Sequence, residues 1–326
     1  MIRRQFLGAA ALAMGSCLLP AAAWSAGAPG QVESALRDFG SLPGATSGLV
    51  ACESAEGPWR AGIRPDAVLF VGSAVKTFIL AECLRAAEAG RLSENDAWAI
   101  DDTVRSPSSP VFLELSGATP ARSVLEAMIT HSDNTATDAA LARATPGRVR
   151  ALIAEAGLTN TRIPDSTRRL FSYLAGAPDG VDLGWAGMEK MKSGWMPGPP
   201  RSPMNDRQAM VSTASEMVRW YQQSLAGQYF TKPETLTEYR RIQAMADSLS
   251  KVAPPDALAW GKGGSIDWER FHCFSLPGQM IVNGRRATFC FTINWTGPDD
   301  GIGAMFEKYR ASVASVLKAV AANRTG

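Results

Sequence analysis

The segment FVGSAVKTFILAECLRAAEAG, residues 70–90, combines a long apolar helical pattern with two chemically active side chains. The pattern predicts a helix, and Gly90 is typical of the position just beyond a helix end. Ser73 and Lys76 stand three residues apart, so one helix face would carry both. A serine needs a neighbouring base, and a lysine shielded from water can serve because burial lowers its pKa. The first helical turn also offers backbone N–H groups to a developing oxyanion.

Two further short motifs carry compatible chemistry. The SDN triplet at residues 132–134 offers a hydroxyl for proton relay and a carboxamide that can hold a substrate amide, although a loop with a helix cap also explains it. Lys262 lies in a strand-like run before two glycines, where it can bind a substrate carboxylate while the glycines let a substrate approach. A glycine bulge with a solvent-facing lysine is the alternative. Each motif alone is weak evidence for a catalytic site, and only the occurrence of all three makes the evidence specific.

Hydrophobic periodicity places strands at both ends of the chain and helices between them. Asn283-Gly284 is a strong hairpin signal, and Thr213 with Glu216 forms a capping box. Strand patterns cover residues 47–54, 257–266, 270–275, 279–282 and 286–295, the third and fourth being separated by Pro277-Gly278. Helical patterns cover residues 31–40, 123–129, 135–144, 148–156, 213–225 and 302–321. We predict an α+β fold, in which an antiparallel sheet formed from both chain ends, with flanking helices, receives an all-helical insertion.

We divide the chain into an export signal over residues 1–26, for the reasons given below, and a single domain over residues 27–326. The sheet part is expected at about residues 27–70 and 212–326, and the helical part at about residues 71–211. A cleft between two such layers is a common place for a binding site.

The N-terminal segment has the pattern of an export signal. Arg3 and Arg4 precede an apolar run, and three alanines at residues 21–23 offer a cleavage site. The arginine pair predicts twin-arginine export of the folded protein to the periplasm or the medium, with a membrane anchor as the alternative. Loss of the segment leaves equal numbers of basic and acidic residues, which gives no electrostatic case for nucleic acid or a membrane surface. We expect a monomer.

The cysteines and histidines indicate whether disulfides or a metal site are expected. Cys52 and Cys290 both lie in strand-like runs, so a cross-strand disulfide and buried thiols are both open in an exported protein. His131 and His272 are far apart, and the sequence has no CxxC or HExxH pattern. We therefore expect neither a metal site nor a cofactor.

In this order, the three motifs resemble the S-x-x-K, S-D-N and K-T-G signature of class A β-lactamases and penicillin-binding proteins. The similarity includes flanking residues, such as ITHSDNTA at 129–136 and PPDALAWGKGG at 254–264, and covers nearly all of the mature chain. The resemblance implies a β-lactamase/transpeptidase-like fold. It also implies a serine hydrolase whose partner is a small β-lactam, peptide or amide substrate.

The resemblance gives each catalytic residue a role. Ser73 would attack the substrate carbonyl and form an acyl-enzyme. Lys76 would be its base or part of the base network, and Ser132 would protonate the leaving nitrogen. Asn134 would hold the amide of the substrate side chain.

The third motif would bind the substrate. Lys262 would contact the carboxylate, with Gly263 and Gly264 beside it, and the N–H groups of Ser73 and Ser265 would hold the oxyanion. The family has threonine or serine where this chain has Gly263. A hydroxyl that helps to hold the carboxylate is therefore missing, and Ser265 is a candidate to replace it.

A second departure concerns release of the acyl group. The family carries a Glu-x-x-Leu-Asn loop whose glutamate activates the deacylating water, and ungapped counting puts Thr167 at the glutamate position. Asp138 stands where the family has an asparagine that contacts this glutamate. We expect Asp138 to pair with Arg168 or Arg169, with a catalytic role as the alternative. Asp165, the nearest carboxylate in the loop, is either a substitute base for the water or a helix cap.

Three functions follow from these motifs. The first is a β-lactamase-like serine hydrolase that deacylates slowly. The second is a D-alanyl peptidase, amidase or esterase, suggested by the altered third motif and by the insertion around Trp185, Trp195 and Met196. The third is a penicillin-binding sensor or binding module without turnover. The Gly- and Pro-rich segment at residues 192–207 is either a lid over the site or a surface insertion.

Overall fold

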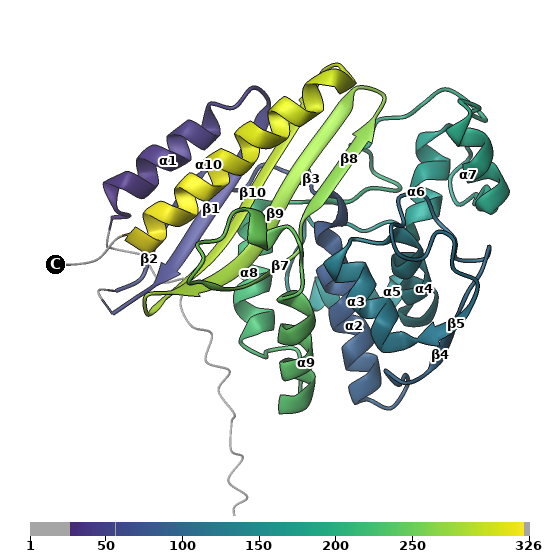
Figure 1. Ribbon diagram of the computed structural model, residues 1–326, viewed down its shortest axis with the longest axis horizontal. Helices are drawn as coiled ribbons and strands as arrows, with labels where there is room; N and C mark the ends of the chain where they lie inside the picture. Colours follow the sequence, from purple (N-terminus) through teal and green to yellow (C-terminus); the bar gives the residue numbers. More distant parts are fainter. Residues whose placement is uncertain (1–26, 56, 323–326) are drawn as a thin grey trace, which may run out of the picture.

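The computed structural model describes residues 27–55 and 57–322, and an antiparallel sheet forms its centre (Figure 1). The strand order is β2-β1-β10-β9-β7, and β8 pairs with β9 on the same edge as β7. The main sheet comprises β1 (Ala45–Glu53), β2 (Trp59–Ile63), β7 (Leu258–Gly261), β8 (Gly264–Trp268), β9 (Phe271–Val282) and β10 (Arg285–Thr296). Two small sheets pair β3 (Leu69–Phe70) with β6 (Val211–Ser212), and β4 (Ala97–Ile100) with β5 (Gly117–Pro120).

The hairpin between β9 and β10 joins the two longest strands. Asn283 and Gly284 have φ of 50° and 74°, the left-handed conformation that a two-residue type I′ turn requires. The turn sets the register in which Val282 faces Arg285. Because β1 then pairs along β10, strands from both ends of the chain lie side by side. The sheet predicted from both chain ends is therefore confirmed.

Two predicted strand boundaries were wrong, and both concern the same edge. The run predicted as one strand over residues 257–266 is divided into β7 and β8 around Lys262 and Gly263. The two pieces predicted on either side of Pro277 are one continuous strand, β9. The Pro277 carbonyl oxygen accepts a hydrogen bond from the Lys262 N–H at 3.2 Å. In an antiparallel strand the N–H and C=O of one residue point to the same side, so the N–H that proline lacks would point to the break between β7 and β8. A proline is tolerated there because no ladder partner is lost.

Helices cover the sheet and form the inserted region (Figure 1). The terminal helices α1 and α10 lie side by side on one face, and α8 packs against β1, β9 and β10 from the other. The helices are α1 (Gly30–Gly40), α2 (Lys76–Glu88), α3 (Ala121–Thr130), α4 (Asn134–Ala144), α5 (Pro146–Glu155), α6 (Thr167–Leu174), α7 (Gly184–Lys192), α8 (Ala214–Leu225), α9 (Pro233–Gln243) and α10 (Ile302–Ala322). The predicted α+β class with a helical subdomain is confirmed.

A buried polar cluster fixes α2 against α8 and α9. The Thr77 hydroxyl oxygen accepts hydrogen bonds from Trp220 Nε1 at 2.9 Å and Gln243 Nε2 at 2.7 Å, and the Tyr239 hydroxyl lies 2.8 Å away. All four side chains are buried, and a satisfied buried network holds its elements in one arrangement. Since Thr77 directly follows Lys76, this cluster also holds the start of α2 in place.

Of the two alternatives left open for the cysteines, the cross-strand disulfide between Cys52 and Cys290 is not formed. The register of β1 with β10 places Cys290 opposite Leu49, and Cys52 opposite Ala287. All four cysteines of the described residues are buried, in keeping with the alternative of core thiols. The predicted export signal lies outside the described residues, and within them no helix is long and apolar enough to cross a membrane.

Candidate active site

Ser73 lies in a 3-10 turn, η1 (Gly72–Val75), that leads into α2. The helix predicted over residues 70–90 therefore begins only at Lys76, because Leu69 and Phe70 pair with β6 and residues 72–75 form the 3-10 turn. Gly72 has φ of 54°, and a Cβ there would lie 2.7 Å from the Ser265 nitrogen. A Cβ on Gly264 would lie 2.8 Å from the Ser73 nitrogen. Both glycines let β8 approach η1, which places the two predicted oxyanion-hole segments against each other.

Lys76 is fully buried and lies at the centre of the site. Its Nζ donates to the Ser132 backbone oxygen at 2.6 Å, to Ser132 Oγ at 3.2 Å and to Asn134 Oδ1 at 2.8 Å. Burial, followed by the charge of Lys262, lowers the pKa of Lys76 well below its usual value, despite the opposing charges of Asp133 and Asp138. The lowered pKa makes the neutral amine accessible, as a base beside Ser73 requires.

The loop that carries Ser132 is held in an unusual conformation. Ser132 has φ of 60°, which is costly for a residue with a side chain. Asp133 compensates, since its carboxylate accepts the Ala136 N–H at 2.7 Å and the N–H groups of Val111 and Phe112 at 2.9 Å each. The helix cap by Asp133 and the contacts of Ser132 and Asn134 with Lys76 therefore occur together in the SDN motif.

Lys262 is buried at the break between β7 and β8, so the alternative of a solvent-facing lysine was wrong. Its Nζ donates to the Gly263 carbonyl oxygen at 2.7 Å. Burial lowers the pKa of Lys262 to about 8, although the charge of Asp247 acts in the opposite direction. A cation that loses this much solvation gains from binding an anion.

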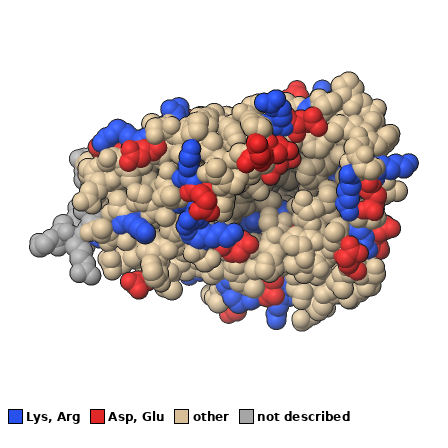
Figure 2. All heavy atoms as spheres, turned by 45° about the horizontal axis from the view of Figure 1, so that its top comes forward, with Lys and Arg blue, Asp and Glu red and all other residues tan. Residues whose placement is uncertain are grey.

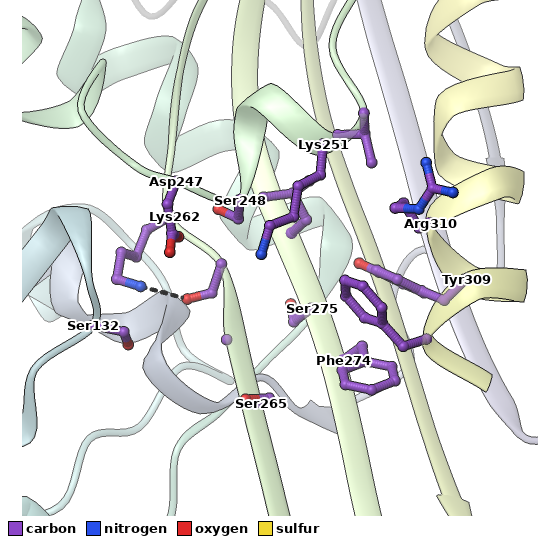
Figure 3. A pocket seen from close by; sticks show the side chains of 15 residues that line it. Ser132, Asp247, Ser248, Lys251, Lys262, Ser265, Phe274, Ser275, Tyr309 and Arg310 are labelled. Atoms are coloured by element: carbon purple, nitrogen blue, oxygen red, sulfur yellow. Dashed lines mark hydrogen bonds between the residues drawn. The ribbon is translucent and has the colours of Figure 1, made fainter. Parts of the chain in front are cut away.

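Two adjoining cavities bring the predicted residues together. Ser73, Ser132, Asn134 and Ser265 line a cavity of about 730 Å³. Ser132 and Ser265 also border a cavity of about 180 Å³ that contains Lys262, Gly263 and Gly264 (Figure 3). Lys76 Nζ contacts Ser132, which borders both cavities. The structure thus assembles the three sequence motifs in one place.

Sequence comparison decides the family of this chain. A sequence model of the beta-lactamase enzyme family matches residues 31–271. The chain belongs to this family. Among curated proteins, none matches the sequence.

Solved structures of β-lactamases and related proteins share the fold at low identity. The structure of PBP-A is 15% identical, with a TM-score of 0.68 over 90% of this chain and 97% of that one. A beta-lactamase from Xanthomonas campestris pv. campestris is 17% identical, with a TM-score of 0.66 over 89% and 97%. The chromosome-encoded beta-lactamase of Vibrio parahaemolyticus is 17% identical, with a TM-score of 0.67 over 90% and 100%.

In this member of the β-lactamase family, the carboxylates around Thr167 are engaged in structural contacts. Asp138 Oδ1 and Oδ2 accept the N–H groups of Thr167 at 2.6 Å and Arg168 at 3.0 Å, which caps α6. The expected pairing of Asp138 with the guanidinium of Arg168 or Arg169 was wrong. The Arg168 guanidinium binds Asp182 at 2.6 and 2.7 Å, and that of Arg169 lies 3.8 Å from the Asp165 carboxylate. Burial raises the pKa of Asp138 to about 6, and the backbone hydrogen bonds counteract only part of this effect.

Asp165 is not brought to Ser73. Its carboxylate accepts hydrogen bonds from Arg150 at 2.7 Å and Gln208 at 2.9 Å, and it lines a different cavity. Burial would raise the pKa of Asp165, but the hydrogen bonds and the charge of Arg150 lower it below its usual value. The helix cap is not Asp165 either, because Ser166 accepts the Arg169 N–H at the start of α6.

The walls of the Ser73 cavity contain residues that the sequence did not single out. Phe171, Met188 and Trp268 form an apolar side, and Asp267 is the one carboxylate among the described lining residues. Asp267 Oδ1 lies 2.9 Å from Nδ1 of the buried His272. In sequence, these residues follow ordinary helix and strand patterns, so only the fold could bring them to the site.

The segment at residues 192–207 does not cover the cavity. Within it, Lys192 reaches the lining, at the end of α7. Arg201 fastens the segment to β8 and to the end of α6. Its backbone oxygen accepts from Trp268 Nε1 of β8 at 3.1 Å, and its guanidinium donates to the carbonyl oxygens of Tyr173, in α6, and Ala177, just beyond it. These contacts favour the surface insertion over the lid.

Proposed function

We propose that this protein is an exported serine hydrolase that forms an acyl-enzyme at Ser73 with a β-lactam or a related amide. The supporting observation is the buried Lys76, whose Nζ contacts Ser132 and Asn134 at the edge of the cavity that contains Ser73. Family membership and the shared fold agree with this chemistry.

Each proton in the proposed acylation has a donor and an acceptor. Neutral Lys76 takes the Ser73 proton while the Ser73 oxygen bonds to the substrate carbonyl carbon. The N–H groups of Ser73 and Ser265 bind the oxyanion that develops. When the C–N bond breaks, Ser132 Oγ gives its proton to the leaving nitrogen and regains one from Lys76 Nζ, which lies 3.2 Å away. Lys262 binds the substrate carboxylate as a cation.

We further propose that the acyl group leaves slowly. Hydrolysis needs a base that activates water, and ungapped counting along the sequence puts Thr167 at the position of the family's glutamate. The nearby Asp138 is occupied by two backbone N–H groups. A mutant of PBP-A, which shares the fold, has been solved as an acyl-enzyme complex with penicillin G.

Incubation with a chromogenic cephalosporin tests both proposals. We expect a burst of product stoichiometric with the protein, followed by slow turnover, and no burst for Ser73→Ala. Rapid linear turnover would contradict slow release, whereas absence of any burst would contradict acylation.

A second candidate substrate is a D-alanyl peptide or ester, which would use the same acyl-enzyme. The apolar wall of Phe171, Met188 and Trp268 beside Ser73 favours a substrate with a large apolar acyl side chain. Hydrolysis of such peptides and esters by the wild type but not by Ser73→Ala would support this substrate class. Rapid β-lactam hydrolysis with no action on peptides or esters would exclude it.

We propose twin-arginine export as well, on the strength of Arg3 and Arg4 before the apolar run. Replacement of both residues by lysine should retain the protein in the cytoplasm. Unchanged export of that variant would contradict the proposal.

A further inference from the structure

Ser248 fills the space that a side chain at residue 263 would occupy. A Cβ built on Gly263 would lie 2.8 Å from both Cβ and Oγ of Ser248. Such a distance is too short for any real side chain, so threonine or serine at residue 263 and serine at residue 248 exclude each other without a shift. The missing side chain of the third motif is thus replaced in space by a residue from another segment.

The Ser248 hydroxyl is buried and has no hydrogen-bond partner among the described residues. Ser248 directly precedes a short 3-10 turn, η2 (Leu249–Lys251), yet its side chain does not cap that turn. A buried hydroxyl without a partner is costly, and such groups in a folded protein call for a specific explanation. A ligand that accepts its proton would supply the missing hydrogen bond.

The surroundings of Ser248 favour an anionic ligand. Figure 3 shows Ser248 beside Asp247 and Lys262 at the end of the cavity that Ser132 also borders. Lys262 Nζ donates to a backbone carbonyl and makes no ion pair with a carboxylate of the described residues. The Asp247 N–H donates to the Thr130 oxygen at 3.3 Å, which ties the Ser248 segment to the end of α3, next to the SDN loop. The cavity lining contains the cations Lys251, Lys262 and Arg310 against the one carboxylate of Asp247, and Ser248 lines the same small space.

We infer that Ser248 Oγ donates a hydrogen bond to the substrate carboxylate held by Lys262 and so takes over the role of the hydroxyl absent at Gly263. This inference rests on the proposed acylation of Ser73. It replaces Ser265 as the expected substitute, because Ser248 Oγ, 2.8 Å from the built Cβ, is the hydroxyl beside the vacated position. Ser248 is a substrate-binding residue, and it takes no part in bond breaking.

The test compares Ser248→Ala with the wild type on two penicillins that differ only at the carboxylate, benzylpenicillin and its methyl ester. The second-order rate constant for acylation of Ser73 is measured by intact mass spectrometry. We expect the variant to lose about tenfold with the acid and to match the wild type with the ester, since one hydrogen bond to a charged group is removed. Ser250→Ala is the matched control, because Ser250 is exposed and bonds to the Asp247 backbone oxygen.

A double variant tests whether the hydroxyl can be moved from residue 248 back to residue 263. Gly263→Thr alone should lower acylation by the acid, since the new side chain collides with Ser248. Ser248→Gly with Gly263→Thr removes the collision and moves the hydroxyl back to the strand, and we expect it to regain most of the loss.

The outcomes separate this inference from the proposed function. Equal rates for Ser248→Ala and the wild type with the acid, or an equal loss with acid and ester, would overturn the role of Ser248 while leaving acylation intact. Failure of the wild type to acylate with either compound would overturn the proposed function. Normal rates with the ester show that each variant is folded.

Discussion

The region proposed for acylation and the loop proposed for release of the acyl group are built in opposite ways. In the proposed acylation centre, made of Ser73, Lys76 and the SDN loop, a buried amine with a lowered pKa contacts the Ser132 hydroxyl and the Asn134 carboxamide. In the release loop, residues 161–169, Asp165 is bound to Arg150 and Gln208, and the nearby Asp138 caps α6. The first region places a buried amine beside the Ser132 hydroxyl, whereas the second region binds its carboxylates with arginine, glutamine and backbone N–H groups.

Under the proposed function, formation and release of the acyl-enzyme depend on different regions of the fold. Acylation needs a nucleophile, a base and an oxyanion site, all of which depend on the contact of η1 with β8 and the SDN loop. Release needs one further base for water, placed on a different loop. A chain can therefore lose the second function without disturbing the first.

Removal of the proposed base Lys76 should have the largest effect on the acylation rate, because no group would then accept the Ser73 proton. Lys76→Ala should slow acylation by about 10²–10⁴-fold, the usual contribution of a general base. The rate is measured by intact mass with benzylpenicillin, with Lys318→Ala on the exposed face of α10 as the control. Equal rates for the Lys76→Ala variant and the wild type would show that another group activates Ser73.

Loss of the α6 cap tests whether the carboxylate at residue 138 is structural. Asp138→Ala leaves two buried N–H groups without an acceptor, so we expect the free energy of unfolding to fall by about 2 kcal/mol. Denaturant unfolding measures this change. Asp165→Ala, which removes a partly exposed ion pair, should cost less than about 1 kcal/mol and leave the acyl-enzyme lifetime unchanged. A shortened or prolonged lifetime in the second variant would restore Asp165 as a participant in release.

Insertion of a base tests whether the release loop can be made to resemble its counterpart in the family. The double variant Asp138→Asn with Thr167→Glu should shorten the acyl-enzyme lifetime about tenfold, less than an optimally placed general base achieves. Thr167→Glu alone should do less, because two adjacent carboxylates raise each other's pKa. Lifetimes are followed by mass spectrometry, and no change in the double variant would mean that release is limited by something other than a missing base.

The pH dependence of acylation sharpens the account of substrate binding. Lys262 is charged below its pKa of about 8 and neutral above it, so the advantage of an acid substrate over its ester should be lost as pH rises through 8. Between pH 7 and 9, we expect the ratio of acid to ester acylation rates to fall about tenfold, in line with the loss of the protonated form. The ratio cancels the titration of Lys76. A ratio that stays constant would show that Lys262 does not bind the carboxylate as a cation.

Much of the fold followed from local sequence signals. The Asn283-Gly284 turn and the apolar run after Ser73 determine short-range structure, so hairpin and helix were predictable. The course of β9 through Pro277 was not, because the tolerance for proline depends on where β7 and β8 break on the neighbouring edge. Strand continuity is a property of the pairing, which the strand's own residues do not encode.

The sequence predicted those site residues that belong to one of the three motifs. Ser73, Lys76, Ser132 and Lys262 meet as expected because each belongs to a motif with its own local geometry. Ser248 belongs to no motif, and its importance appears only when Gly263 is seen beside it. The hydrogen-bond partners of Asp138 were not predicted either. Its carboxylate binds backbone N–H groups, which every residue but proline has, so the sequence contains no signal for this contact.

Time-resolved intact mass spectrometry of the wild-type protein with benzylpenicillin tests the central claim most directly. The account predicts a stoichiometric adduct on Ser73 that forms quickly and persists long after free penicillin has been removed. Rapid disappearance of penicillin with no adduct, or an adduct located on a different residue, would contradict it.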